Sequence, residues 1–427
     1  MIFRLLVLRY LLALKFARWR FRGRIGALQQ RRWRRLRKTL LRSPFYAPLA
    51  EAHAPHGEYP RLNKARFMAK FDAINTVGVR RSEAEALAAR AETERDFAPT
   101  LNGIAVGLSS GTSGNRGVFL ASERERARWV AGVLDRVLGW SWQPRKVAFF
   151  LRANNKLYAA AGSRLLRFEF FDLLLPVPEH LGRLRELQPD VLVGQPSLLL
   201  ALAARVEAGE LDFRPTKIIS VAEVLYPEDR RLLSRVFGQP IHEVYQCTEG
   251  FLAATCEHGR LHFNEDFLLI EKRHVDAEKR RFQPVITDLL RTSQPVIRYE
   301  LNDVVVPLSE PCTCGRATLA IAAIEGRSDD VLRFQDATGT ERIIFPDHFR
   351  RAIIGADPEI QDYELIARGL RELELFVAGA ETTYQRAATA VRTFLTQQNI
   401  PDVSISRLPN SPLLPGQKLR RIRNDYR

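Results

Sequence analysis

Cysteine is scarce in this sequence, with four residues among 427. So few cysteines exclude a fold framed by disulfides, of the kind found in small secreted domains. A run of about 20 apolar residues, which a transmembrane helix requires, is also missing. Arg4, Arg9 and Lys15 interrupt the most apolar stretch, at the start of the chain. No small-residue cleavage site follows that stretch, so it is a poor match to a secretory signal, and we expect a cytoplasmic protein.

Acidic residues are missing from the first 50 positions, which carry 14 Lys and Arg. The remaining 377 residues carry 51 Lys and Arg against 49 Asp and Glu, so the net charge of +16 arises from one segment. We therefore expect no specific nucleic-acid partner. A basic amphipathic arm over residues 1–43 can lie on an anionic membrane surface, which would make the protein membrane-peripheral. It can equally pack as a helix on the body of the protein, and the sequence leaves both interpretations open.

The residue pattern of the first part of the chain predicts helices. The pattern predicts a basic helix from about residue 15 to 43, which Pro44 and Pro48 then end. The segment SEAEALAARAETERD at 82–96 is rich in Ala, Glu and Arg and predicts a second helix, followed by Pro99. At 46% apolar residues, the whole chain is long enough for two or three domains.

The middle and the end of the chain differ in pattern. Apolar runs at 147–151, 190–194 and 217–222 alternate with helical stretches such as PEDRRLLSRVFG. This alternation predicts an α/β fold with parallel strands and a ligand at their C-terminal ends. From about residue 333 the pattern is that of a small, separate α+β domain, with ELELFVAG as a strand and TTYQRAATAVRTFLTQQN as a helix.

A hydroxyl-rich loop, LSSGTSGNRG, lies between Leu108 and Gly117. Glycines let the backbone bend around an anion, and Ser and Thr hydroxyls donate hydrogen bonds to phosphate oxygens. By itself the segment is equally an ordinary Ser/Gly turn. The candidate phosphate-binding residues are Ser109, Ser110, Gly111, Thr112, Ser113 and Gly114.

Five further motifs follow this loop in order over some 300 residues: SVAEVL (220–225), YQCTEG (245–250), PVIRYELND (295–303), GRSDD (326–330) and LPGQKLRRI (414–422). From residue 43 onward the chain resembles the adenylate-forming (AMP-binding) superfamily. Within it, the sequence resembles phenylacetate-CoA ligases, CapK-type proteins and, most of all, the group related to coenzyme F390 synthetase. The resemblance implies a large multi-layer α/β adenylation domain over 44–332, after the arm at 1–43. A small mobile α+β C-terminal domain would follow over 333–427.

The resemblance also implies roles for particular residues in binding ATP and Mg²⁺. The loop would hold the triphosphate, and Tyr245 would stack on adenine. Thr248 would contact phosphate, and Glu249 would bind Mg²⁺, the hard cation that offsets phosphoryl charge. The remaining nucleotide-binding positions are Ala222 and Glu223 beside adenine, Gln246 in the same motif as Tyr245, Asp303 at the ribose, and Arg327 at the ribose or phosphate. Arg298 is as readily explained as the partner of a nearby acid.

Lys418 in the motif GQK matches a catalytic lysine that arrives when the small domain closes. A mobile cation there can stabilise the charge that develops as pyrophosphate leaves. Its alternative is a solvated lysine in a basic tail. The chain departs from the family in the phosphate loop, where many relatives have Lys and this sequence has Asn115 and Arg116. Because the guanidinium group is a rigid fork, Arg does not replace Lys geometrically, which puts phosphate affinity or turnover in doubt.

Three of the cysteines lie in two short segments, CEHGRLH at 256–262, which also contains two histidines, and CTCGR at 312–316. Zinc prefers four tetrahedral nitrogen and sulfur ligands, and paired short spacings suit a closed structural site. The predicted Zn²⁺ ligands are Cys256, His258, Cys312 and Cys314, with His262 as the alternative to His258. The relatives named above commonly have a similar cluster. In their pattern, however, the histidine at position 262 faces the substrate cleft.

These features predict an enzyme that activates a carboxylic acid, aryl or similar, as its acyl-AMP with release of pyrophosphate. Transfer to coenzyme A or a carrier-protein thiol would follow. The segments LRANNKLY at 151–158 and GQPSLL at 194–199 are expected to build the acyl pocket. One alternative is adenylyl transfer to a hydroxyl, as in coenzyme F390 synthetase. The other is a non-catalytic basic protein that associates with a membrane or nucleic acid.

Overall fold

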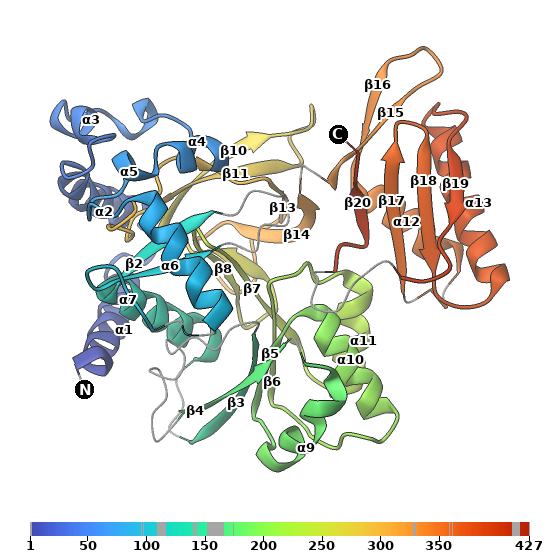
Figure 1. Cartoon of the computed structure of the whole chain (residues 1–427), viewed down its shortest axis with the longest axis horizontal. Helices are drawn as coiled ribbons and strands as arrows, with labels where there is room; N and C mark the ends of the chain where they lie inside the picture. Colours follow the sequence, from blue (N-terminus) through green and yellow to red (C-terminus); the bar gives the residue numbers. More distant parts are fainter. Residues whose placement is uncertain are drawn as a thin grey trace.

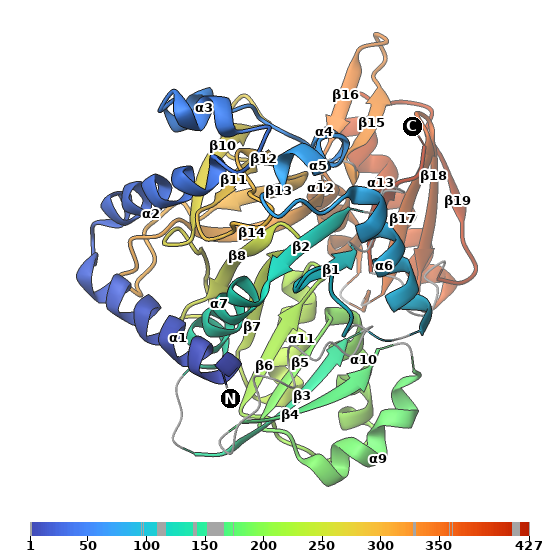
Figure 2. The same cartoon turned by 60° about the vertical axis from the view of Figure 1, so that its left-hand side comes forward.

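The computed structural model describes residues 2–94, 96, 98–108, 117–139, 143–151, 166–173, 175–327, 330–357, 359–360, 362–411 and 419–426. Figures 1 and 2 show a central body with the chain's two ends on opposite sides of it. Among the described residues, no helix combines the length and apolarity that crossing a bilayer requires.

Two helices, α1 (Ile2–Arg20) and α2 (Ile25–Leu40), form the N-terminal arm, which we define as residues 2–43. The single helix expected from about residue 15 is therefore wrong. Helix begins at Ile2, where the apolar residues have helical spacing, and it breaks at residues 21–24. Gly23 adopts a positive φ of 72° there, a left-handed conformation that favours glycine and ends the helix.

Short helices lead from the arm to the body: α3 (Ala47–Glu51), η1 (His56–Glu58), α4 (Lys64–Ala69) and α5 (Phe71–Ile74). The predicted Ala/Glu/Arg helix is confirmed as α6 (Arg81–Glu94). The antiparallel hairpin β1 (Ile104–Leu108) and β2 (Val118–Ser122) follows, and the hydroxyl-rich loop connects its two strands. Ser122 and Glu125 cap the next helix, α7 (Glu123–Val133), with a reciprocal capping box. That helix continues into the π-helical turn η2 (Leu134–Leu138).

A mixed sheet forms the body. Its strand order is β10-β11-β13-β14-β9-β8-β7-β6-β5-β3-β4, and β12 pairs with β11. The parallel part consists of β3 (Arg145–Leu151), β4 (Leu166–Asp172), β5 (Val191–Gly194), β6 (Lys217–Val221) and β7 (Ile241–Cys247). The antiparallel part consists of β8 (Gly250–Thr255), β9 (Leu261–Phe263), β10 (Leu268–His274), β11 (Phe282–Asp288), β12 (Tyr299–Glu300), β13 (Asp303–Pro307) and β14 (Ala320–Arg327). The predicted parallel α/β pattern thus holds for five of the twelve strands described in this sheet.

Helices α9 (Val177–Leu187), α10 (Pro196–Glu207) and α11 (Pro227–Phe237) cover the parallel part. Leu184, Leu199 and Leu233 on these helices are fully buried in one apolar cluster with the sheet. All four residues of β5 are buried, as expected for a strand covered on both faces. The other face belongs to a larger cluster that includes α7, β8 and the N-terminal arm.

The C-terminal unit, defined here as residues 332–426, has an apolar cluster of its own. It begins with the hairpin β15 (Leu332–Gln335) and β16 (Glu341–Ile344). A four-stranded sheet follows, in the order β19 (Ser404–Arg407), β18 (Glu372–Val377), β17 (Tyr363–Gly369), β20 (Ile422–Asn424). Helices α12 (Pro346–Ala356) and α13 (Glu381–Gln397) pack with this sheet. The strand and the helix predicted from ELELFVAG and TTYQRAATAVRTFLTQQN correspond to β18 and α13.

Candidate active site

One large cleft, of about 1900 Å³, lies where the body meets the C-terminal unit. Strand ends of β6, β7, β13 and β14 line it, together with the start of α11 and residues 419–420. Every predicted nucleotide-site residue that the structure describes lines this cleft: Ala222, Glu223, Tyr245, Gln246, Thr248, Glu249, Asp303 and Arg327. These residues come from four separate motifs, so the fold brings the motifs together.

Several predicted site residues lie outside the described residues: Ser109, Ser110, Gly111, Thr112, Ser113, Gly114, Asn115, Arg116, Lys418 and positions 152–158. The described residues next to two of these segments do line the cleft. Leu108 immediately precedes the hydroxyl-rich loop, and Leu419 immediately follows Lys418.

Glu249, the predicted Mg²⁺ ligand, is held by two hydroxyl groups. Tyr299 donates a hydrogen bond to its Oε1 at 2.8 Å, and Thr248 donates one to its Oε2 at 2.8 Å. Arg291 donates to the Thr248 backbone carbonyl at 2.7 Å and so fixes the turn that carries both residues. Each carboxylate oxygen accepts more than one bond, so both retain lone pairs for a cation. The donor set therefore fits a hard metal ion.

Asp303, the predicted ribose partner, stands at the start of β13, directly opposite Arg327 on β14. Its Oδ2 accepts a hydrogen bond from the Tyr245 hydroxyl at 2.5 Å. A register shift between Tyr245 and Gln246 interrupts the pairing of β7 with β8, and such bulges re-aim side chains. The bulge explains how a strand residue comes to reach across to Asp303.

The edge predicted to lie beside adenine has two unusual features. Ala222 has a φ of 69°, a left-handed conformation that is uncommon for a residue with a side chain. The hydroxyl of Ser220, two residues earlier, is buried in the cleft wall without a hydrogen-bond partner among the described residues. Strained backbone and an unpaired buried hydroxyl are typical of a surface shaped for a ligand.

Glu223 links the body to the C-terminal unit. Its Oε1 accepts a hydrogen bond from the Leu419 backbone N–H at 3.1 Å, and its Oε2 accepts one from the Ser197 N–H at 3.2 Å. The contact places Leu419, which follows the GQK motif in the sequence, against the predicted adenine edge.

The surroundings of Arg298 and Cys247 favour a structural role for each residue. Arg298 forms a bidentate ion pair with Glu271 at 2.8 and 2.7 Å, so it is a structural partner, as one interpretation held. Burial, together with the charges of Glu249 and Asp303, raises the pKa of the Cys247 thiol. A neutral thiol is a poor nucleophile, so these surroundings do not favour a catalytic Cys247.

Lys64 on α4 was missed by the sequence interpretation. It lines the cleft near Glu249 and Arg327, and burial lowers the pKa of its ammonium group. Arg291 and Tyr299, which hold the Thr248–Glu249 turn, were missed as well. Their partners lie 43 to 50 residues away in the chain. No local pattern marks such pairs, although Tyr299 belongs to the PVIRYELND motif.

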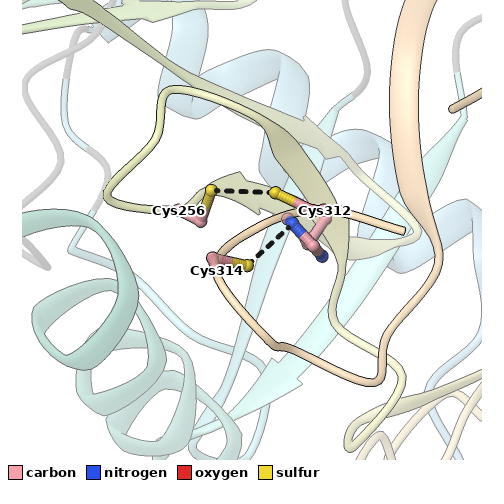
Figure 3. Close-up of side chains that lie close together, drawn as sticks. Cys256, Cys312 and Cys314 are labelled. Carbon is pink, nitrogen blue, oxygen red and sulfur yellow. Dashed lines mark hydrogen bonds between the residues drawn. The ribbon is translucent and has the colours of Figure 1, made fainter. Parts of the chain in front are cut away.

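A cysteine/histidine cluster lies near the cleft. The ligand atoms of Cys256, His262, Cys312 and Cys314 all lie within 4.8 Å of one another. Figure 3 shows the three thiols grouped together, with dashed lines for the two contacts that follow. The Sγ atoms of Cys256 and Cys312 are 3.9 Å apart, and Cys314 Sγ is 3.4 Å from His262 Nε2. For zinc–sulfur bonds of about 2.3 Å, tetrahedral geometry requires sulfur atoms about 3.8 Å apart, so the cluster fits Zn²⁺.

The turns and the histidine orientation agree with a metal site. Gly259 and Gly315, each at positive φ, donate backbone hydrogen bonds to the carbonyls of Cys256 and Cys312, so two similar tight turns present the thiols. His262 Nδ1 lies 3.2 Å from the Thr318 carbonyl, to which it donates. That bond leaves Nε2 free of a proton and facing the sulfurs, and burial lowers the imidazole pKa. Neutral histidine held in this way is the form that binds metal.

The prediction of His258 as the histidine of this cluster is wrong, and its alternative His262 takes the place. Ala254 pairs with His262 across the β8–β9 hairpin. Cys256 is two residues beyond Ala254, so strand alternation points Cys256 and His262 to the same face. His258 lies in the exposed turn between the strands and lines the large cleft instead. The expectation that residue 262 faces the cleft is therefore reversed as well.

Comparison with known proteins identifies the fold that carries this site. No family model matches the sequence. The phenylacetate-coenzyme A ligase of Thermus thermophilus is 26% identical over 110 residues, which is 25% of this chain and 24% of that protein. The structure of 2-hydroxyisobutyryl-CoA ligase in its postadenylation state matches with a TM-score of 0.68 at 19% identity, over 94% of this chain and 90% of that one. The chain has the fold of the adenylate-forming ligases.

Two further observations refine this fold assignment. An amide bond synthetase from Marinactinospora thermotolerans has a TM-score of 0.56 at 14% identity, over 90% of this chain and 92% of its own. The 2-hydroxyisobutyryl-CoA ligase in its thioesterification state scores 0.55, lower than in its postadenylation state. The overall arrangement of this chain is therefore more similar to the postadenylation state than to the thioesterification state.

Proposed function

We propose that this protein uses ATP to activate a carboxylic acid as its acyl-AMP and then transfers the acyl group to a thiol. The observation that supports this most directly is the convergence of Tyr245, Glu249, Asp303 and Arg327 on one cleft. These four residues, from three separate motifs, match the positions at which the adenylate-forming ligases bind ATP. Isolated surface residues would have no reason to share a cleft at the strand ends of the sheet.

In the first step, a carboxylate oxygen attacks the α-phosphorus of ATP. A bond from carbon-bound oxygen to phosphorus forms, and the bond from the α-phosphorus to the bridging oxygen breaks, so pyrophosphate leaves. Glu249 would hold Mg²⁺, which offsets the charge on the phosphates. Asp303 would accept hydrogen bonds from the ribose hydroxyls, in place of the one it now receives from Tyr245. Arg327 and Lys64 would add positive charge at the same wall of the cleft.

Lys418 is the proposed cation that assists departure of pyrophosphate. The hydrogen bond from the Leu419 N–H to Glu223 supports this role, because it holds the neighbouring residue at the cleft. The proposed division is an arm at 1–43, an adenylation domain at 44–332 and a C-terminal domain at 333–427. The separate apolar cluster of the C-terminal unit supports the second boundary.

The proposed substrate is an aryl or similar acid, and the proposed acceptor is coenzyme A or a carrier-protein thiol. Support comes from relatives whose names specify an acid and coenzyme A: phenylacetate-coenzyme A ligase and 2-hydroxyisobutyryl-CoA ligase. The described wall of the cleft also contains aromatic and apolar side chains, among them Phe149, Trp129 and Leu225. Such side chains suit a planar acid.

We further propose that Cys256, His262, Cys312 and Cys314 bind one structural Zn²⁺. Four protein ligands leave no open coordination position, so the ion would stabilise the fold and take no part in the reaction. It would tie the β8–β9 hairpin, which follows the Thr248–Glu249 turn, to the loop between β13 and β14.

Exchange of labelled pyrophosphate into ATP, measured with a panel of aryl and fatty acids, tests the proposed activity. We expect exchange that depends on a particular acid. Glu249→Gln should lower its rate about 10²-fold or more, as expected from several kcal/mol of lost charge stabilisation. Glu51→Gln, a change at an exposed residue on α3 away from the cleft, is the matched control and should leave the rate unchanged. If none of the acids in the panel supports exchange, in protein that still binds ATP, the proposed acid activation is contradicted.

A further inference from the structure

Helix α1 has two apolar faces, and only one of them is buried. Val7, Leu11 and Leu14 face inward and belong to the same apolar cluster as the body. On the outer face lie six large apolar side chains that are 45–72% exposed. They are Ile2, Leu5, Leu8, Leu12, Phe16 and Trp19, which we call the apolar stripe.

The stripe is a single continuous surface. At 3.6 residues per turn, its six positions fall within an arc of about 120° on the helix. Of the ten large apolar side chains described as exposed, six lie on this one helix. A cluster of this kind marks a contact with another surface, whereas single exposed apolar residues are ordinary.

Positive charge borders the stripe along both edges. By the same helical geometry, exposed Arg4 and Lys15 lie along one edge, exposed Arg20 lies at the other, and exposed Arg9 lies just inside that second edge. Residues 2–50 contain no Asp or Glu. Two copies of this surface would therefore repel each other, which argues against a contact between identical chains.

The helix is also held rigidly in this orientation. Arg18 forms an ion pair with Asp135 at 2.5 Å, and the Arg128 guanidinium lies 4.9 Å from the centre of the Tyr10 ring. Figures 1 and 2 show α1 at the outer edge of the molecule, beyond α7 and on the opposite side from the C-terminal unit. A plane brought against the stripe would leave the C-terminal unit away from the contact.

We propose that α1 docks the protein on an anionic lipid bilayer. The stripe would enter the boundary between headgroups and acyl chains, and the flanking cations would pair with lipid phosphates and carboxylates. This inference does not depend on the proposed reaction, because none of its residues lines the cleft.

Co-sedimentation of the full-length protein with vesicles tests the proposal. We expect binding to phosphatidylcholine vesicles containing 30% phosphatidylglycerol to be at least ~10-fold stronger than to pure phosphatidylcholine, and to weaken as salt is raised. The triple variant Leu12→Ser, Phe16→Ser, Trp19→Ser should lose at least ~10-fold in binding. Arg386→Gln with Arg392→Gln, on the exposed face of α13, is the matched control and should bind like the unmodified protein.

Three results would overturn the proposal. One is equal vesicle binding by the triple variant and the unmodified protein, provided their melting temperatures agree. A second is a concentration-dependent dimer that the triple variant abolishes, which would make the stripe a contact between two copies. The third is salt-sensitive binding to duplex DNA but not to vesicles, which would make the arm a nucleic-acid contact.

Discussion

The two ends of the chain join the same body through different kinds of contact. The N-terminal arm shares the body's apolar cluster, to which it contributes Val7, Leu11 and Leu36. The C-terminal unit has its own cluster and reaches the body through ion pairs, among them Arg421 with Asp229 at 3.1 Å. Separating apolar surfaces exposes them to water, whereas the charges of a separated ion pair regain their hydration. The difference favours an arm that stays packed on the body and a C-terminal unit whose contact with the body depends on a few charged pairs.

Loss of the metal should affect the body most strongly. Cys312→Ser removes one of the four proposed ligands, so we expect bound zinc to fall from about one ion per chain to near zero. The unfolding transition of the body should drop by on the order of 10 °C or more, at about 2–4 °C per kcal/mol. Elemental analysis and calorimetry measure both effects. Cys247→Ser, outside the cluster, should keep the metal, and an equal zinc content in both variants would refute the site.

Removing Arg421 tests the contact between the C-terminal unit and the body. Arg421 is buried and pairs with Asp229 of the body and with Asp362 of its own unit at 2.8 Å. Arg421→Met leaves the Asp229 carboxylate buried without a partner, which costs about 3–5 kcal/mol. We expect pyrophosphate exchange to fall about 10²-fold while the body stays folded. Arg386→Met, which removes a largely exposed guanidinium group from the Asp357 carboxylate, should cost about 0–1 kcal/mol.

The Arg421→Met variant should recover in acid. Burial already raises the pKa of Asp229 to about 6, a shift that Arg421 opposes. When the C-terminal unit is docked on the body, the pKa of Asp229 lies above that of a free aspartate, so protonation of Asp229 favours docking. The free-energy cost of docking with a charged Asp229 appears as the pH rises through that pKa. Lowering the pH from 8 to 6, or adding Asp229→Asn, should therefore restore part of the exchange. A variant equally impaired at both pH values would show that Arg421 acts in another way.

Truncating apolar side chains in the two clusters should affect different parts of the molecule. Leu36 on α2 is 2% exposed, and Leu375 on β18 is fully buried. Each change to Ala should cost about 2–5 kcal/mol. Calorimetry should show Leu36→Ala lowering the transition of the body and Leu375→Ala lowering a separate transition of the C-terminal unit. If both changes shift one shared transition equally, the two ends do not differ in the way proposed.

The smallest effect should come from Glu125, which joins α7 to the loop before β12. Its carboxylate accepts hydrogen bonds from Ser122 and from the Ser293 N–H at 2.8 Å, and these bonds lower its pKa against the effect of burial. A depressed pKa contributes stability above about pH 4.3, the value of a free Glu, and that stability is lost as the pH falls through the folded value. Glu125→Gln should remove about 1–3 kcal/mol at pH 7 and flatten the acid side of the stability curve of the body alone.

The sequence identified many residues that line the cleft because they are concentrated in short motifs. SVAEVL, YQCTEG and PVIRYELND each contain residues that line the cleft, and local order was enough to find them. The hydrogen bonds that hold Glu249 in place were not predicted, because its partner Tyr299 lies 50 residues away in the chain. The choice of His258 in place of His262 was wrong for the same reason, because strand pairing cannot be read from local spacing. The spacing C-x-H suggested His258, but the pairing of Ala254 with His262 decides which side chain reaches the thiols.

The sequence by itself determined the fold class, the basic arm and the order of the nucleotide motifs, because these depend on composition, periodicity and local residue pattern. Only the tertiary structure decided that the larger part of the sheet is antiparallel, that His262 joins the cysteines, and that α1 is buried on one face and exposed on the other. A helix with apolar residues on both faces carries no signal for which of them packs inward. That choice depends on what lies opposite, and here α7 covers one face of α1 and leaves the other, bordered by cations, exposed.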